Sequence, residues 1–186
     1  MRKLKLQIQI SIDGFIAGPN GEMDWVTFNW SDDLKKYVAE LTEPVDTILL
    51  GRKLAEGFIP YWTDAFKKPV PEEGAQKFVE TSKIIFSKTL SHSQWDNTII
   101  NNGDLVTEVN ALKHSDGNDL IVYGGSSFVS SLIKENLIDE LHLFINPVSI
   151  GNGLAIFNKL SVNQHYHLIQ SKKFDCGIVV NTYKKV

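Results

Sequence analysis

Hydrophobic and polar residues alternate with a period of two at both ends of the chain. Alternation over Leu4–Ser11 predicts a first β-strand, and the turn formers Asp13 and Gly14 end it. Tyr166–Lys173 and Ile178–Lys184 alternate on either side of a turn, which predicts an antiparallel hairpin that closes the fold. Between the two ends, short and mostly apolar runs predict further strands at Val45–Leu50, Lys83–Phe86, Thr98–Asn101, Leu120–Tyr123 and Glu140–Ile145.

Apolar residues recur at helical spacing between these strands. Ser31 can cap a first helix, which is expected to stop before Pro44. A short helix is expected after Gly51, and the prolines from Pro60 onward are expected to break up the region that follows. Further helices are predicted at Ala75–Glu80, around Leu105–Leu112 and around Phe128–Ile133. This order predicts an α/β fold in one domain over residues 1–186, with a mostly parallel sheet, helices on both faces and an antiparallel edge.

A pair of glycines follows one of the predicted buried strands. The residues Tyr123, Gly124, Gly125, Ser126 and Ser127 predict the end of a strand, a tight turn and the start of a helix. Glycines let the backbone approach a ligand closely, and the uncapped N–H groups at a helix start direct partial positive charge toward it. The segment therefore predicts a site for a phosphate. The alternative is a tightly packed junction without a ligand, and neither the Rossmann nor the Walker fingerprint is present.

Two other turns follow predicted strands, and both carry cations. Gly51 is followed by Arg52 and Lys53, and Ser87 is followed by Lys88. Because ligands bind outside the carboxyl ends of the strands in such sheets, we expect these turns and the glycine pair to meet at one edge. Cations in the first turn of a helix are unfavourable for its dipole, which favours a bound anion there. The alternative for the cations is an ordinary exposed surface position.

The composition limits the classes of function. With 186 residues, 42 % of them hydrophobic, and a net charge of −3, the chain suits one globular domain and has no general affinity for nucleic acid or an anionic membrane. Cys176 is the only cysteine, which excludes an internal disulfide and a cysteine-based zinc cluster. We therefore expect a reducing compartment, the cytoplasm. His165 and His167 have no third ligand beside them, so no metal site is predicted.

Five motifs occur in an order that resembles the dihydrofolate reductase-like fold and spans nearly the whole chain. These motifs are Ser11–Ala17, Met23–Trp25, Leu50–Arg52, Phe86–Lys88 and Tyr123–Ser126. Asp139–Leu141, followed by Pro147–Val148 and Gly151–Gly153, is similar to the C-terminal reductase domain of bifunctional riboflavin-biosynthesis deaminase-reductases and their stand-alone relatives. The resemblance implies a homodimeric, NADPH-dependent reductase of a small heterocycle, most like a 5-amino-6-(5-phosphoribosylamino)uracil reductase.

The resemblance also implies where NADPH lies. The expected contacts are Gly124, Gly125 and Ser126 for the pyrophosphate, Gly51, Arg52, Lys53, Ser87 and Lys88 for the adenosine phosphates, and Ile16, Ala17 and Gly18 for the nicotinamide. The deaminase half of the bifunctional proteins would need a His/Cys zinc site with a catalytic Glu, which one cysteine cannot supply. Only the reductase half is therefore at issue.

Asp33 is the predicted catalytic residue. Folate reductases place a carboxylate in the first helix after a Pro-Trp pair, whereas here Asp24 precedes Trp25, so Asp33 is the nearest equivalent and folate specificity stays open. We expect Asp33 to orient the substrate or to relay a proton, and the alternative is that it only stabilises its helix. Asp13, which is also typical of a turn, and water are the other proton sources. For the whole protein, the alternatives are a pterin reductase and a nucleotide-binding module without chemistry.

Overall fold

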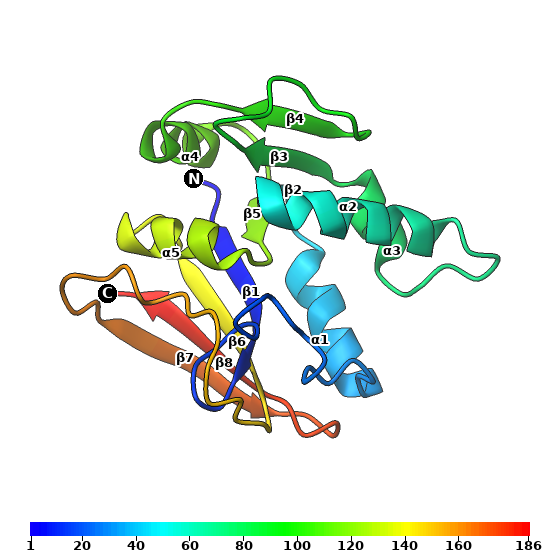
Figure 1. The fold of residues 1–186 in the computed structure, drawn as a ribbon, viewed down its shortest axis with the longest axis vertical. Coiled ribbons are helices and arrows are strands. Elements are labelled where there is room, and N and C mark those ends of the chain that lie inside the picture. Colours follow the sequence, from blue (N-terminus) through cyan, green and yellow to red (C-terminus); the bar gives the residue numbers. More distant parts are fainter.

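The computed structural model describes residues 1–186 and contains eight strands and five helices (Figure 1). In chain order these are β1 (Leu4–Ser11), α1 (Asp32–Thr42), β2 (Val45–Gly51), α2 (Arg52–Phe66), α3 (Ala75–Glu80), β3 (Ser82–Phe86), β4 (Thr98–Asn101), α4 (Leu105–His114), β5 (Asp119–Val122), α5 (Ser126–Lys134), β6 (Glu140–Asn146), β7 (Tyr166–Lys173) and β8 (Val179–Lys185). One sheet has the strand order β4-β3-β2-β5-β1-β6-β8-β7. Neighbours from β4 to β6 pair in parallel, and β8 is antiparallel to β6 and β7, which confirms the predicted fold class.

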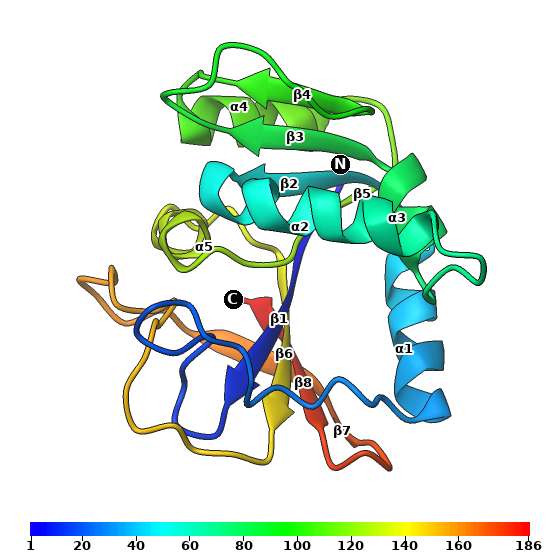
Figure 2. The same ribbon diagram turned by 45° about the vertical axis from the view of Figure 1, so that its right-hand side comes forward.

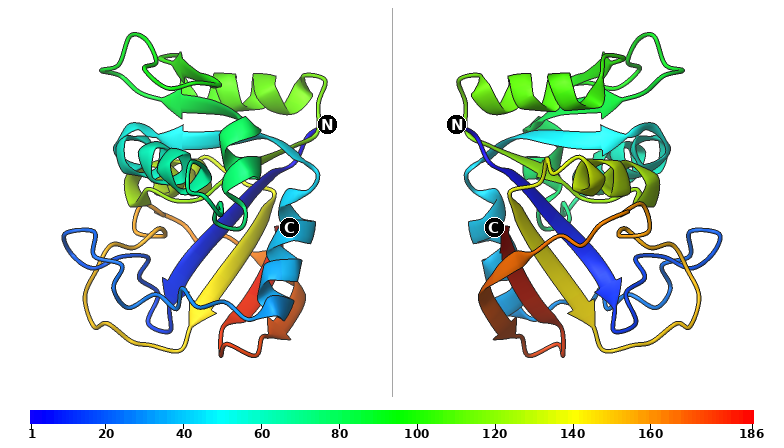
Figure 3. Two further views of the ribbon diagram at one scale, coloured as in Figure 1. Left: turned by 90° about the vertical axis from the view of Figure 1, so that its right-hand side faces the viewer. Right: turned by 90° about the vertical axis from the view of Figure 1, so that its left-hand side faces the viewer.

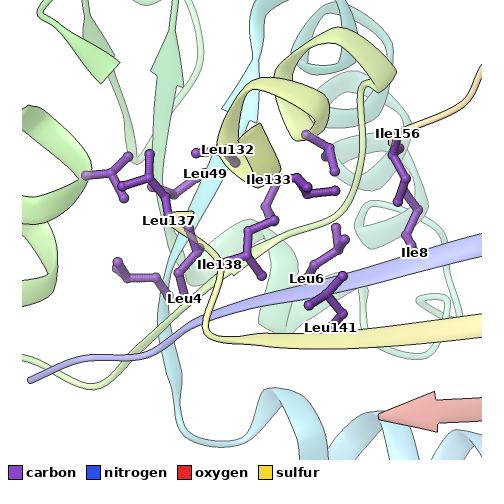
Figure 4. Packing of buried hydrophobic residues seen from close by; sticks show 14 of the residues in the cluster. Leu4, Leu6, Ile8, Leu49, Leu132, Ile133, Leu137, Ile138, Leu141 and Ile156 are labelled. Atoms are coloured by element: carbon purple, nitrogen blue, oxygen red, sulfur yellow. The ribbon is translucent and has the colours of Figure 1, made fainter. Parts of the chain in front are cut away.

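The alternation along β1 separates the two faces of the sheet. Its even-numbered apolar residues, Leu4 to Ile10, are at most 5 % exposed and belong to a core of 17 residues. This core includes Val109 of α4 and Leu132 of α5, so α4 and α5 cover this face (Figure 4). Full burial of one such side chain stabilises a fold by roughly 1.5–3 kcal/mol, which fixes the register of β1. The odd-numbered residues are polar and point to the opposite face.

Three helices cover the opposite face in two separate places. Packing of α2 and α3 over β2, β3 and β5 buries residues such as Phe78 and Ile121. Packing of α1 over β6 and β8 buries residues such as Leu34 and Phe144. The left panel of Figure 3 shows β1 passing between these two groups of helices with no helix in front of its carboxyl half. Helices therefore lie on both faces, as predicted, but the polar side of β1 has no helix of its own.

Helix α2 corrects one prediction. It runs from Arg52 to Phe66 and contains Pro60, whereas a shorter helix was expected, followed by a region that prolines from Pro60 onward break up. A proline inside a helix removes the bond to the carbonyl four residues earlier, here that of Glu56. Glu56 and Pro60 both lie on the exposed side, where water can satisfy that carbonyl, while a buried stripe that includes Ile59 holds the helix on the sheet. The side on which a proline lies therefore decides whether it breaks this helix.

Candidate functional site

The carboxyl ends of four adjacent strands form an uneven edge. Gly51 at the end of β2 pairs with Phe86 at the end of β3, and Leu49 of β2 pairs with Val122 at the end of β5. The turns that follow β2, β3 and β5 therefore lie side by side, and the structure brings together the three turns singled out in the sequence (Figure 2). Val122 also pairs with Leu6, so β1 continues beyond the end of β5 as far as Ser11.

The turn between β5 and α5 has the geometry of an anion site. Gly125 has a φ of +80°, which residues with a Cβ adopt only with strain. The first backbone hydrogen bond of α5 joins the N–H of Val129 to the carbonyl of Gly125, so the N–H groups of Ser126 and Ser127 have no partner inside the helix. Free N–H groups at a helix start are typical contacts of phosphate oxygens.

Helices α2 and α5 start next to each other at this edge. A Cβ on Gly51 would lie 2.9 Å from the Cβ of Phe128, closer than side chains pack, so Gly51 allows the two helices to approach. Arg52 and Lys53 lie in the first turn of α2. The guanidinium of Arg52 contacts the carboxylate of Glu56 at 2.6 Å, and Lys53 is exposed. A cation thus lies on each of the first two residues of α2, beside the neighbouring helix start.

Ser87 and Lys88 follow β3 at the same edge. The Ser87 hydroxyl accepts hydrogen bonds from the N–H groups of Thr89 (3.1 Å) and Leu90 (3.0 Å), which closes a tight turn. The Lys88 ammonium donates to the carbonyls of residues 102 and 103 at 2.7 and 2.8 Å, so the side chain bridges two loops. Since an ammonium has three donors, Lys88 keeps one for a ligand.

A backbone strap joins the loop after β1 to the start of α5. Ile16 donates its N–H to the carbonyl of Leu154 at 2.8 Å, and Leu154 donates to the carbonyl of Ala17 at 2.9 Å. The next carbonyl, that of Ala155, accepts from the hydroxyl of Ser126 at 2.8 Å. The residues predicted to contact the nicotinamide, with Gly18 next in the chain, are therefore connected through residues 154 and 155 to those predicted to contact the pyrophosphate.

Asp13 holds the same strap in place. Its carboxylate accepts hydrogen bonds from the hydroxyl of Ser11 (2.6 Å) and from the N–H of Gly151 (2.7 Å). These contacts, the Ser11 one first, lower the pKa of Asp13. A carboxylate that is ionised and bound in this way organises the loop and is a poor proton donor near neutral pH.

Lys159 was not recognised from the sequence. Its ammonium donates to the carbonyl of Ser127 at 3.0 Å and to the hydroxyl of Ser131 at 3.0 Å, so a cation lies against the first turns of α5. A helix start disfavours a nearby cation unless an anion accompanies it. No local sequence signal marks Lys159, because it reaches α5 from a segment 32 residues further along the chain.

Tyr123 lies away from the free N–H groups. Its ring packs against Phe58 and Phe78, with centroid distances of 5.7 and 6.4 Å, under the helices α2 and α3. Burial in this aromatic group raises the pKa of the Tyr123 hydroxyl. The side chain therefore supports the packing of α2 and α3, and only its backbone enters the glycine turn.

The structure does not bring Asp33 together with the other predicted site residues. Its carboxylate accepts a hydrogen bond from the Ser31 hydroxyl and, at 3.3 Å, from the N–H of Asp175 in the turn between β7 and β8. These contacts, with the Ser31 one largest, lower the pKa of Asp33. Asp33 thus lies at the antiparallel side of the sheet, whereas Gly125 follows β5 on the parallel side. Its catalytic role stays a prediction.

Two shallow surface hollows lie away from this edge. One, of about 370 Å³, lies around Met1–Arg2 and Ser115–Asp119, and the other, of about 440 Å³, lies at Leu160–His165.

No group of three or more His, Cys, Asp or Glu side chains is arranged to hold a metal ion. None of the five helices is both long and apolar enough to cross a membrane. The carboxyl edge, with its free N–H groups and cations, is therefore the candidate site.

Comparisons with known proteins show which family the sequence matches. The family model described as "RibD C-terminal domain" matches residues 2–180. The uncharacterised protein YyaP of Bacillus subtilis (strain 168) is 33 % identical over 98 % of this chain and 94 % of its own length.

Solved structures share the fold at low sequence identity. A protein of Shewanella sp. PV-4 assigned to riboflavin biosynthesis has a TM-score of 0.76 and 24 % identity over 100 % of this chain and 99 % of its own. The deaminase and 5-amino-6-(5-phosphoribosylamino)uracil reductase of Thermotoga maritima has a TM-score of 0.71 and 20 % identity, over 100 % of this chain and 57 % of its own. Dihydrofolate reductase of Enterococcus faecalis, in complex with NADP(H), has a TM-score of 0.61 and 19 % identity, over 98 % of this chain and 96 % of its own. These likenesses confirm the dihydrofolate reductase-like fold.

Proposed function

The chain belongs to the RibD C-terminal domain family, and from this premise we propose that residues 1–186 act as one NADPH-dependent reductase domain. The substrate is a small heterocycle, most like that of a 5-amino-6-(5-phosphoribosylamino)uracil reductase. The observation that carries the proposal is the start of α5, where the turn at Gly125 leaves the N–H groups of Ser126 and Ser127 free beside the start of α2. Two helix starts next to each other suit the two phosphates of a dinucleotide.

The residues around the edge fit NADPH from end to end. The N–H groups of Ser126 and Ser127 would hold the pyrophosphate, while Arg52, Lys53 and Lys88 would hold the adenosine phosphates. The strap formed by Ile16–Gly18 and residues 154–155 would lie beside the nicotinamide. When bound, NADPH supplies a hydride. The protein then has to orient the acceptor and keep water away, which explains why no nucleophile with an adjacent base is found in the sequence.

We expect the protein to bind NADPH at least tenfold more tightly than NADH. A hydrogen bond between Arg52 and the 2′-phosphate is worth roughly 1.5–3 kcal/mol, because both partners are charged. The present partner of Arg52 is Glu56, in an exposed pair of the kind worth about 0.3–0.5 kcal/mol, so the phosphate can replace it. Titration of both cofactors into the wild type, Arg52→Ala and Glu56→Gln tests this. The first variant should lose the discrimination and the second should keep it, and equal affinity in the wild type would contradict the assignment.

Turnover tests the reductase itself. The protein is mixed with NADPH and a panel of oxidised heterocycles that includes pyrimidine and pterin compounds, and the loss of absorbance at 340 nm is followed. Oxidation that depends on a pyrimidine compound is the expected result. Oxidation that depends only on a pterin would indicate a pterin reductase, and NADPH binding without turnover of any compound would indicate a nucleotide-binding module.

We also propose a homodimer in the cytoplasm. Strand β7 is an edge strand, and its Leu168 and Ile169 are 56 % and 60 % exposed, with Val162 nearby in the chain at 72 %. An exposed apolar edge strand is a surface on which a second chain can pair. Light scattering at micromolar concentration should give twice the 20.9 kDa mass of the chain. A monomer mass would contradict the proposal.

A further inference from the structure

Gln7 carries a buried polar atom that has no partner. The side chain lies in the middle of β1 and is 7 % exposed, and its Oε1 atom makes no hydrogen bond. A buried amide oxygen without a partner destabilises a fold, so such a group indicates a ligand or another role outside folding. His142, the residue directly beside Gln7 in β6, is 6 % exposed, and its Nε2 makes no hydrogen bond, although the carboxylate of Glu140 lies 3.6 Å from it.

The two side chains lie on the face that carries α1 and α2. Lys5 pairs with Ile121, which α2 covers, and residues two apart in a strand point the same way, so Gln7 shares this face. His142 pairs with Gln7, and its Nδ1 lies 2.9 Å from the Tyr37 hydroxyl of α1. Gln7 and His142 therefore lie on the part of the sheet between the two groups of helices, where β1 has no helix over it (Figure 3).

The backbone of Gln7 lies level with the end of β5, the strand that leads into the candidate cofactor site. The last residue of β5, Val122, pairs with Leu6. Gln7 is therefore the first residue of β1 beyond the end of β5, at the level where the chain turns toward Gly124 and Gly125. Open α/β sheets bind their ligands beside the carboxyl ends of their strands.

From this placement we propose that Gln7, with His142 beside it, binds the acceptor heterocycle through a lactam edge, that is, a ring carbonyl next to a ring N–H. The proposal rests on the proposed reductase function and names the substrate class of the same site. A glutamine amide offers one acceptor and a donor side by side, which matches a carbonyl and an N–H in one ring. The amide is neutral, and Lys5 on the same face is already paired with Asp119 at 2.8 Å, so the pair favours a neutral ring edge over a carboxylate.

Binding of two matched probes tests the proposal. The probes are 6-aminouracil, which has free lactam edges, and 6-amino-1,3-dimethyluracil, in which methyl groups block both ring N–H groups. Dissociation constants are measured by ligand-observed NMR with and without saturating NADP⁺. The wild type should bind the free edge at least tenfold more tightly, and Gln7→Leu should bind both probes equally weakly. Gln7→Met, which keeps the unbranched length of glutamine, repeats the test with a different shape.

A stability readout separates a binding role from a structural one. Since the Oε1 of Gln7 has no partner, Gln7→Leu should melt at the same temperature as the wild type or higher. The matched control is Gln170→Leu. Gln170 pairs with Thr182, which pairs with His142 beside Gln7, so it lies in the same row across the sheet but on the exposed edge strand β7. This control should keep the discrimination between the probes.

Two results would overturn the proposal: a wild type that binds both probes equally, or Gln7 variants that still discriminate between them. A bridging water in place of a ligand contact would give the second result. NADPH binding is measured separately by fluorescence on the same samples. If NADPH fails to bind while the probes are discriminated, the proposed reductase function fails and the lactam site stands. If NADPH binds and the probes are not discriminated, the lactam site fails and the cofactor assignment stands.

Discussion

Replacement of Gly125 by alanine should strain the turn that starts α5. The backbone at Gly125 has a φ of +80° and a ψ of +94°, which lies outside the regions that alanine adopts easily. The nearest atoms to a new Cβ are the Cβ atoms of Leu54 at 3.7 Å and Phe128 at 3.8 Å, which is ordinary contact. The cost is therefore conformational and not steric. Such a strained conformation costs about 1–3 kcal/mol, which for a domain of this size lowers the melting temperature by roughly 2–12 °C.

Two assays follow this change. Thermal unfolding measures the strain, and NADPH titration measures whether a relaxed turn still presents the N–H groups of Ser126 and Ser127. We expect both stability and NADPH affinity to fall. Gly57→Ala in α2 is the matched control, because a Cβ there meets nothing within 4 Å and its φ is ordinary. That control should raise stability by about 0.5–1 kcal/mol, the usual gain for glycine to alanine inside a helix, and leave affinity unchanged. A Gly125→Ala protein with wild-type melting temperature and NADPH affinity would refute the assignment of the turn.

Three further predictions concern single residues. If Asp33 orients the substrate, Asp33→Asn should lower kcat by about 10²–10⁴ and leave NADPH affinity nearly unchanged; wild-type turnover would mean that Asp33 only stabilises its helix through its contacts with Ser31 and Asp175. Asp13→Ala should free the strap and raise the KM for NADPH, and an unchanged KM would contradict this. Burial lowers the pKa of Lys83 to about 8, below its unfolded value of 10.5, so its proton is lost first in the folded state and stability should rise between these pH values. The free energy of unfolding should rise by at most about 3 kcal/mol over this pH range. Denaturant unfolding of the wild type and of Lys83→Met measures this rise, and equal pH dependence in the two proteins would contradict a buried, destabilising charge on Lys83.

Local pattern predicted most of the fold. The alternation of apolar and polar residues predicted Leu4–Ser11 and Tyr166–Lys173 with the bounds that the structure has. In β1 this alternation separates an apolar face from a polar one, whereas β7 is exposed along nearly its whole length. The extent of α2 was missed, because the sequence around Pro60 does not show that this residue faces solvent. The aromatic packing of Tyr123 was missed as well, since it depends on Phe58 and Phe78 from two other helices.

The site was predictable only where a strand runs into a turn. Glycine pairs and cations after strands are local signals, and the sheet brings the Gly51, Ser87 and Gly124 turns together because parallel strands end at one edge. The strap from Ala17 through Leu154 to Ser126 has no local signal, because its backbone hydrogen bonds join residues more than 100 positions apart and do not depend on side-chain type. Gln7 looked like one more polar residue of an alternating strand, and only its burial without a partner distinguishes it.

The central claim is that the phosphates of NADPH bind at the start of α5. Backbone amide NMR of the ¹⁵N-labelled protein during NADPH titration tests it most directly. The account predicts large, saturable shifts at Gly124, Gly125, Ser126 and Ser127, and differences between NADPH and NADH that are concentrated at Arg52 and its neighbours. Saturable shifts confined to the hollow at Leu160–His165, or no shifts at any of these amides at saturating NADPH, would contradict it.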